Sequence, residues 1–313
     1  MSILVLHTGG TIGMVATSQG FAPRDGVVED SITTLLQSNV LNAKVDVRLL
    51  TPLIDSANAE PEDWTRVAKL ICQERDNYQG FVVTHGTDTL AYTAAALCFA
   101  LEGLRAPVIV TGSMLPLSEE GSDGHRNLRD ALQAGLSAPA GVWVQFAGQL
   151  MHGARVRKSH STNFDAFRET PNATQPVQKS AQFRLHPFQK KQVAVLAMAP
   201  GQSGGVFKYA AEHCDALLLR CYGSGTAPDT KDLLNALTTA KWRGVPVLAV
   251  SQCPDGGMAI GTYASGAILR DNGVVDGRDM TVEAAYAKLQ HILSLGDAGR
   301  ARLTRTLCGE FTP

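Results

Sequence analysis

The sequence predicts an α/β protein with two domains, each built on a parallel sheet. Short apolar runs of strand length alternate with stretches of helical periodicity along most of the chain. This alternation is typical of βαβ units, in which helices cover both faces of a parallel sheet. It is interrupted over residues 170–192, a linker with Pro171, Pro176 and Pro187 and few large aliphatic residues. The length of 313 residues corresponds to about two domains of ~150 residues. We therefore expect an N-terminal domain over residues 1–184 and a C-terminal domain over residues 185–313.

In the N-terminal domain, strands and helices are expected in strict alternation after the second strand. The run ILVLH at residues 3–7 is a short apolar strand that ends at a glycine pair. In residues 61–76, Trp64, Val67 and Ile71 fall on one helical face, and Pro61 suits the first helical turn because its missing N–H is not needed there. Strands are expected at residues 3–7, 45–50, 81–84, 108–111 and 142–146, and helices at 61–76, 88–102 and 127–136.

The alternation resumes after the linker. The apolar runs here are again of strand length, and the segments between them have helical periodicity. Strands are expected at residues 193–198, 216–220 and 245–251, and helices at 206–214, 229–240 and 281–295.

Composition excludes several classes of function. Hydrophobic residues make up 44% of the chain and charged residues 18%, values of a folded protein with a large core. The 28 Lys and Arg residues balance 29 Asp and Glu residues, so no net field attracts nucleic acid or an anionic membrane. No apolar run approaches the ~20 residues of a membrane span, and the first residues lack the basic start of a signal peptide. The six scattered cysteines form no Cys-x-x-Cys pair, so we expect a reduced, cytoplasmic protein.

Three expected strands end in turns rich in threonine and glycine. The strand at 3–7 is followed by TGGTIG, the strand at 81–84 by HGTDT, and the strand at 108–110 by TGS. The carboxyl ends of parallel strands line the ligand crevice, and glycines let the backbone approach a ligand closely. We therefore expect Thr11, Thr87, Asp88 and Ser113 to face one site. Helix N-caps are the ordinary alternative for each motif alone. A nucleotide loop is disfavoured because the first turn matches neither G-x-G-x-x-G nor a Walker sequence.

A hydroxyl nucleophile needs a group that takes up its proton. Lys158, in the sequence RVRKS at residues 155–159, is the candidate partner for Thr87 and Asp88. A lysine buried beside an acid and a hydroxyl can transfer protons. Composition alone favours a solvated loop for this basic stretch.

With these residues in view, the chain resembles the bacterial type I L-asparaginases over nearly its whole length. Two signature motifs near the N-terminus, in the right order, make the resemblance specific. The matching segments are TGGTIG (8–13), PLIDS (52–56), HGTDT (85–89) with AYT (91–93), TGS (111–113), SDG (122–124), Lys158 with FDAF (164–167), and RCYG (220–223).

The resemblance implies a fold and an activity. The fold is a flavodoxin-like N-terminal domain and a smaller C-terminal α/β domain. The activity is hydrolysis of L-asparagine to L-aspartate and ammonia through a threonine acyl-enzyme, without a metal or an organic cofactor. The resemblance also implies a homodimer or homotetramer.

The resemblance further implies roles for individual residues. Thr11 corresponds to the attacking threonine, and Thr87, Asp88 and Lys158 to a second catalytic group. Ser56 and Asp88 would hold the α-carboxylate and α-amine of the substrate. The remaining substrate-binding positions, which include backbone near the scissile amide, are Thr87, Ser113, Gly10 and Gly86.

One departure from the family concerns the catalytic machinery. The family has a tyrosine on the loop after the first motif, hydrogen-bonded to the first threonine, whereas this chain has Phe21. The first tyrosine of the chain is Tyr78. Water or the Lys158 group would then have to take the proton of Thr11, or turnover is reduced. The segment from Asn58 to Glu60 also departs from the family, at contacts to the substrate ammonium.

Other classes of function have weaker support. Residues 201–205 read GQSGG, a literal G-x-S-x-G, so Ser203 with His291 and one of Asp255, Asp271 or Asp276 could form a serine α/β-hydrolase triad. A non-catalytic amino-acid sensor could use the same crevice as the asparaginase. Metal catalysis is disfavoured because His152 and His160 lack partners at ligand spacing.

Overall fold

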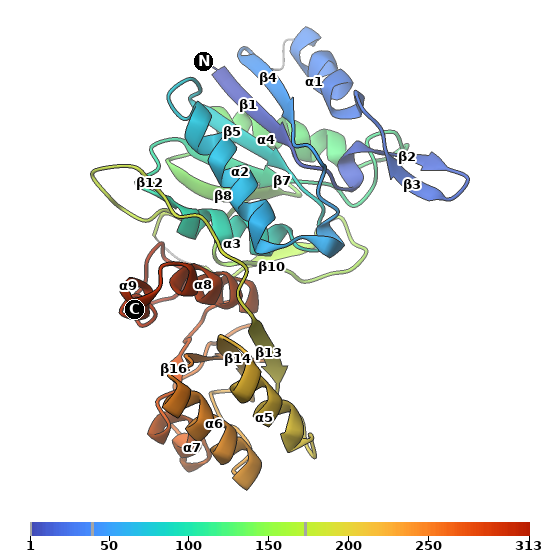
Figure 1. The fold of residues 1–313 in the computed structure, drawn as a ribbon. Helices are drawn as coiled ribbons and strands as arrows, with labels where there is room; N and C mark the ends of the chain where they lie inside the picture. The colour runs from blue at the N-terminus through green and yellow to red at the C-terminus, as the bar shows by residue number, and fades with distance from the viewer. Residues whose placement is uncertain (1, 39–40, 172–173) are drawn as a thin grey trace.

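A computed structural model describes residues 2–38, 41–171 and 174–313. Its ribbon divides into a larger N-terminal part and a smaller part that contains most of the C-terminal residues (Figure 1). Residues 172 and 173 of the expected linker lie outside the described residues. None of the described helices combines the length and the apolar character needed to cross a bilayer.

The larger part is built on a six-stranded sheet with the order β4-β1-β5-β7-β8-β9. All neighbours are parallel except β8 and β9, which are antiparallel. The first five strands follow the 2-1-3-4-5 order of flavodoxin-like sheets, as the resemblance implied. In this order the chain reverses direction across the sheet between β1 and β5, and ligands bind at that switch point. The strands are β1 (Ser2–His7), β4 (Lys44–Leu49), β5 (Gly80–Thr84), β7 (Pro107–Thr111), β8 (Gly141–Phe146) and β9 (Gln149–His152).

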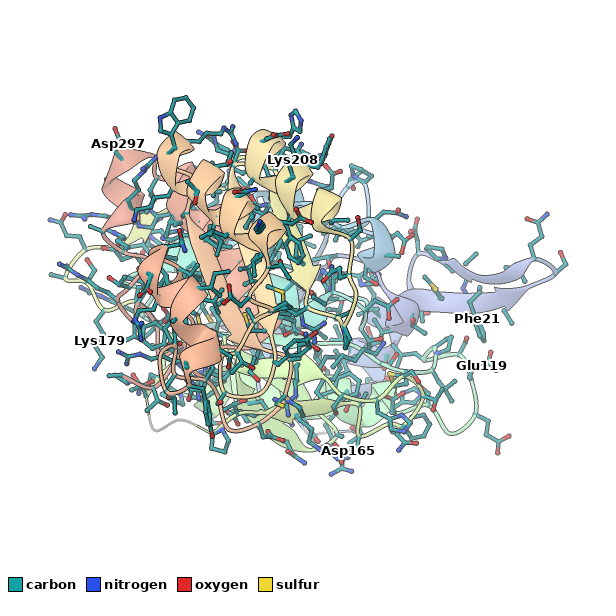
Figure 2. All side chains as sticks on the ribbon, turned by 90° about the horizontal axis from the view of Figure 1, so that it is seen from below. Phe21, Glu119, Asp165, Lys179, Lys208 and Asp297 are labelled. Carbon is teal, nitrogen blue, oxygen red and sulfur yellow. The ribbon has the colours of Figure 1, made fainter. Side chains whose placement is uncertain are left out.

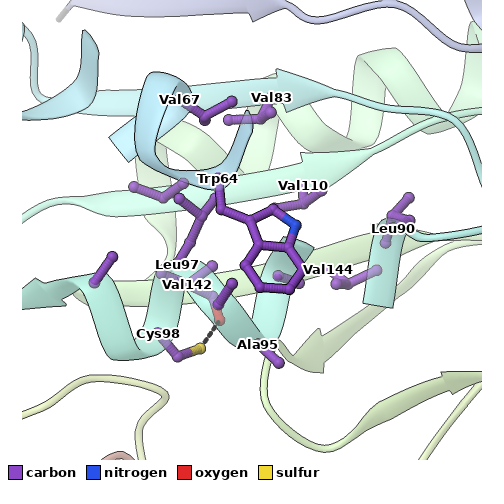
Figure 3. Packing of buried hydrophobic residues seen from close by; sticks show 14 of the residues in the cluster. Trp64, Val67, Val83, Leu90, Ala95, Leu97, Cys98, Val110, Val142 and Val144 are labelled. Carbon is purple, nitrogen blue, oxygen red and sulfur yellow. Dashed lines mark hydrogen bonds between the residues drawn. The ribbon is translucent and has the colours of Figure 1, made fainter. Parts of the chain in front are cut away.

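Helices cover both faces of this sheet. On one face, α2 and α3 pack over Leu4, Val83 and Val110, with Trp64 of α2 inside the cluster (Figure 3). On the other, α1 and α4 pack over Ile3, Val5 and other alternate residues of the same strands. Helix α2 begins with Pro61 and with a reciprocal capping box between Glu60 and Asp63. The helices are α1 (Val27–Gln37), α2 (Pro61–Glu74), α3 (Leu90–Ala100) and α4 (Gly124–Ser137).

The smaller part contains a parallel sheet with the order β13-β14-β15-β16. Helices α5 and α6 cover one face, and α8 covers the other. The elements are β13 (Val193–Ala197), α5 (Gly204–His213), β14 (Ala216–Cys221), α6 (Lys231–Arg243), β15 (Val247–Ser251), α7 (Ala267–Asp271), β16 (Val275–Asp276), α8 (Val282–Ser294) and α9 (Asp297–Arg300).

Helix α8 joins the two parts, between which it lies in Figure 1. Ala285, Leu289 and Ile292 belong to the core of the smaller part. Ala284 and Ala287 belong instead to the core of the larger part, where α8 packs against α3. Helix α3 is apolar on all sides, and all its residues except Tyr92 are buried, as expected of a helix enclosed between a sheet and other helices.

Several elements differ from those expected. The helix expected over residues 88–102 begins only at Leu90, and residues 101–102 form β6 (Leu101–Glu102). This strand pairs with β12 (Arg184–Leu185), so the segment expected to be a linker is attached to the larger part. Helix α1 and two short hairpins were not expected. The hairpins are β2 (Met14–Thr17) with β3 (Gly20–Pro23), and β10 (Val156–Lys158) with β11 (Phe167–Glu169).

Candidate active site

The turns that follow β1, β5 and β7 meet at the switch point of the larger sheet. β5 lies between β1 and β7, so the carboxyl ends of the three strands are adjacent. Gly10 has a φ of 89°, and a Cβ atom there would overlap the backbone of Gly86. Likewise, a Cβ atom at Gly112 would overlap the carbonyl oxygen of His85. These positions require glycine because the three turns are in direct backbone contact.

In the turn after β5, Thr87 and Asp88 are both hydrogen-bonded to Lys158. The Lys158 ammonium donates hydrogen bonds to Thr87 Oγ1 at 2.9 Å and to Asp88 Oδ1 at 2.8 Å. The Thr87 residue is buried, and the Lys158 side chain is only 20% exposed, whereas the Asp88 side chain is 65% exposed. The structure thus brings together three of the expected site residues from segments about seventy positions apart.

The turn after β1 differs in that its threonine has a free hydroxyl. Thr11 begins the 3-10 turn η1 (Thr11–Gly13) and is partly exposed. Its Oγ1 has no hydrogen-bond partner among the residues that the structure describes. Hairpin β2–β3 follows directly and projects from the body of the molecule, with Phe21 half exposed on it (Figure 2). Phe21 lies in the strand opposite Ala16 and offers no hydroxyl to Thr11.

The turns after β1 and β5 are each supported by a buried histidine. His85 Nδ1 lies 2.8 Å from the carbonyl oxygen of Gly86, and its Nε2 lies 3.0 Å from Thr93 Oγ1. His7 Nδ1 lies 2.7 Å from Thr84 Oγ1, and a Cβ atom at Gly13 would contact the His7 ring at 2.7 Å. Burial lowers the pKa of both imidazoles, so the two rings are uncharged supports of the turns at neutral pH.

The expected substrate-binding serines have different surroundings. Ser56 begins the 3-10 turn η2 (Ser56–Asn58), which Asp55 caps. Its hydroxyl lies so close to Gly86 that a Cβ atom at this glycine would overlap it. Thr89 Oγ1 donates to the carbonyl oxygen of Ser56 at 2.8 Å and fixes this turn against the end of β5. Ser113 is buried, and its hydroxyl donates to the Leu115 carbonyl oxygen at 2.5 Å.

Sequence reasoning missed the residues that hold the third turn and the lysine. Asp123 accepts hydrogen bonds from the backbone N–H groups of Met114 and Leu115 and from Asn127 Nδ2. The interpretation of residues 155–158 as a solvated loop, favoured by composition, is wrong. Arg155 is only 1% exposed and forms an ion pair with Asp279 at 2.7 Å. The only sequence signal for these anchors was the run of basic residues that includes Lys158.

The serine-hydrolase alternative has no geometric support in the described residues. Ser203 precedes α5, whereas the buried His291 ring stacks on Phe99 and lies near His186. Burial lowers the pKa of His291 to about 3. The three candidate acids bind arginine side chains or backbone N–H groups instead: Asp255 with Arg157, Asp271 with Arg270, and Asp276 with the N–H groups of Ile260 and Arg278.

The histidines considered as metal ligands also have local partners. His152 Nδ1 accepts from the N–H of Ala154, and His160 Nδ1 accepts from the N–H groups of Thr162 and Asn163. Over the described ranges, no group of three His, Cys, Asp or Glu side chains is arranged to hold a metal ion.

Comparisons with known proteins agree with this geometry. The family model described as "Asparaginase, N-terminal" matches residues 2–192, and that of the "Glutaminase/Asparaginase C-terminal domain" matches residues 192–306. L-asparaginase 1 of Escherichia coli K12 is 38% identical over 333 aligned positions, which cover 100% of this chain and 98% of that protein.

Solved structures agree as well. The thermostable L-asparaginase from Thermococcus kodakarensis superposes with a TM-score of 0.90 at 33% identity, over 100% of both chains. L-asparaginase I from Vibrio cholerae superposes with a TM-score of 0.87 at 34% identity, over 100% of this chain and 99% of that chain. Together with the two family models, which account for almost the whole sequence, these likenesses show that the chain belongs to the asparaginase family.

Proposed function

We propose that this protein hydrolyses the side-chain amide of L-asparagine to L-aspartate and ammonia. The observation that carries the proposal is the contact of the Lys158 ammonium with Thr87 Oγ1 and Asp88 Oδ1, at the switch point of a sheet whose neighbouring turn presents Thr11. Hydroxyl groups, a charged proton carrier and backbone glycines at one edge of the sheet suit acyl transfer from a small amide.

In the proposed reaction, Thr11 is the nucleophile. Its Oγ1 adds to the amide carbon, and the hydroxyl proton passes to water or to the group formed by Thr87, Lys158 and Asp88. The C–N bond then breaks, and the nitrogen leaves as ammonia with one added proton. Water attacks the resulting threonine ester, which releases aspartate and restores the Thr11 hydroxyl. Phe21 has no role in proton transfer because it carries no hydroxyl.

The remaining positions are proposed to bind substrate. Ser56 and Asp88 hold the α-carboxylate and the α-ammonium, Asp88 because it is the exposed acid beside the two turns. Gly10 and Gly86 lie where the first two turns touch, and Ser113 follows Gly112, where the third turn touches the second. N–H groups at such a junction can stabilise an oxyanion, and loss of one such donor costs about 3 kcal/mol.

We also propose a domain boundary near residue 185, a cytoplasmic location and a homodimer or homotetramer. The six cysteines are all unpaired thiols, which suits a reducing compartment. Tyr209 on α5 and Trp242 on α6 are 65% and 87% exposed in the single chain. With Val206 and Leu234 they form a group of exposed apolar side chains on two helices that pack against each other. An exposed apolar surface of this kind suits an interface between subunits.

The test of the proposed function is ammonia release by the purified protein from L-asparagine, beside L-glutamine and a blank. We expect release from asparagine, with discrimination against glutamine limited to about 1–3 kcal/mol if it depends on one methylene alone. Binding of aspartate or asparagine without any ammonia release would contradict hydrolysis. Such binding would indicate a non-catalytic amino-acid sensor, an alternative that the absence of a tyrosine at position 21 leaves open.

A further inference from the structure

The strand that carries Lys158 lies outside the main sheet. In the described residues, β10 pairs only with β11, with Val156 opposite Glu169, Arg157 opposite Arg168 and Lys158 opposite Phe167. No strand pairing therefore fixes Lys158 relative to the turn after β5. Side-chain contacts of the hairpin set the position of its ammonium group. Val156 and Phe167 hold one face of the hairpin in the core of the larger part.

Arg157 anchors β10 on the side away from Lys158. Successive side chains of a strand point to opposite faces, so Arg157 and Lys158 diverge. The Arg157 guanidinium donates to the carbonyl oxygen of Pro254 and, at 2.9 Å, to Asp255 Oδ1. Both acceptors lie just beyond β15 in the smaller part of the molecule. One residue of β10 thus contacts the candidate active site, and its neighbour contacts the other part of the chain.

The arginine opposite Arg157 has no such anchor. Arg168 forms an ion pair with Asp165 at 2.6 Å and donates to the carbonyl oxygen of Phe167. These partners belong to the same hairpin, and both side chains of the ion pair are 49% exposed. The Arg157 side chain, by contrast, is only 17% exposed. Arg168 is therefore a matched control, with the same residue type on the same face of the hairpin but no tether to the smaller part.

We propose that Arg157 is a positioning residue for Lys158. It ties β10 to the loop after β15 and so keeps the Lys158 ammonium in place on Thr87 and Asp88. The inference rests on the proposed function, because it assigns importance to that contact. A displacement of about 1 Å in a catalytic arrangement can lower the rate ~100-fold.

A second anchor, Arg155, directly precedes the same strand. Arg155 Nε donates to the Thr170 carbonyl oxygen at 2.7 Å, and its guanidinium pairs with Asp279. Asp279 also accepts from the N–H and the hydroxyl of Thr312. Removing a partner from so buried a pair would strand a charge and endanger folding. Arg155 and Asp279 are therefore left intact in the test.

The test compares Arg157→Met, Arg157→Lys and Arg168→Met with the wild-type protein. Methionine keeps much of the apolar stem of arginine and removes the guanidinium. We expect kcat for ammonia release from L-asparagine to fall about 10- to 100-fold in Arg157→Met, with a much smaller change in KM. Arg157→Lys should recover part of kcat because its ammonium can still reach one acceptor, and Arg168→Met should match the wild type.

A second readout does not depend on turnover. Amide hydrogen exchange over residues 156–158 should be faster in Arg157→Met than in Arg168→Met, because only the first loses the tether. Equal exchange in the two variants, or equal kcat, overturns the inference. If the wild type itself releases no ammonia from asparagine, the proposed function fails. The exchange comparison then still decides whether Arg157 fixes β10.

Discussion

The turns after β1 and β5, which carry Thr11 and Thr87, have similar backbone surroundings, but their threonine hydroxyls have different hydrogen-bond partners. Each follows a buried parallel strand, rests on a buried uncharged histidine and touches the other turn through glycine backbone. Thr87 is buried and bonded to Lys158, whereas Thr11 is partly exposed with a hydroxyl that has no partner among the described residues. We infer from this difference that Thr87 takes part in proton transfer and that Thr11 is the nucleophile, as proposed above.

Replacing either threonine should have the largest effect on activity. We expect Thr11→Val and Thr87→Val each to lower ammonia release from L-asparagine at least ~1000-fold, because residues that act as a unit lose most of the rate when one is removed. The two variants should differ in the acyl-enzyme. Mass spectrometry of acid-quenched Thr87→Val should detect an aspartyl adduct on residue 11, whereas Thr11→Val should give none.

Serine variants are the matched controls for these substitutions. Thr11→Ser and Thr87→Ser keep the hydroxyl and should retain much more activity than the valine variants. Wild-type activity in Thr11→Val would remove Thr11 from the role of nucleophile. An aspartyl adduct on residue 87 instead would show that Thr87 is the nucleophile.

Replacing Lys158 should leave the hydroxyls of both threonines without a lysine partner. In Lys158→Met, the Thr87 hydroxyl loses its charged donor and, like Thr11, has no basic partner. General acid–base groups contribute about 100- to 10,000-fold, and we expect a loss of kcat within this range. Steady-state assays over a range of pH measure it. An unchanged pH profile of the residual activity would argue that Lys158 does not take part in proton transfer.

The contact between the turns can be weakened at Gly10. A Cβ atom there would overlap the Gly86 backbone, and the φ of 89° is unfavourable for any other residue. We expect Gly10→Ala to lower the free energy of unfolding by about 1–3 kcal/mol and to reduce kcat, since the two hydroxyls separate. Denaturant titration gives the first quantity. Gly121→Ala is a suitable control, because its positive φ is similar and its Cβ atom would meet open space.

Much of this arrangement could be predicted from the sequence. The alternation of apolar runs and helical periodicity located the principal strands of both sheets, and the glycine-rich turns placed Thr11, Thr87 and Ser113 at one sheet edge. The hairpins β2–β3 and β10–β11 were missed. The first is largely exposed, and each strand of the second places only one large apolar side chain, Val156 or Phe167, in the core, so neither has an apolar run to mark it. The burial of Arg155 could not be inferred either. Its partner Asp279 is more than a hundred positions away, and the composition around Arg155 does not indicate such a pair.

The smallest expected effect is also the one that tests the asymmetry between the turns most directly. Phe21→Tyr places a hydroxyl on hairpin β2–β3, at the position where the resemblance to the asparaginases implies a tyrosine bonded to the first threonine. If Thr11 lacks an acceptor for its proton, kcat for ammonia release should rise, by up to about tenfold for a partly effective base. Stability should change little, because Phe21 is half exposed. The rise should depend on Thr11 and vanish in a Thr11→Val background. Equal rates with and without the new hydroxyl would mean that water or the Lys158 group already accepts this proton, and that the first turn needs no acceptor of its own.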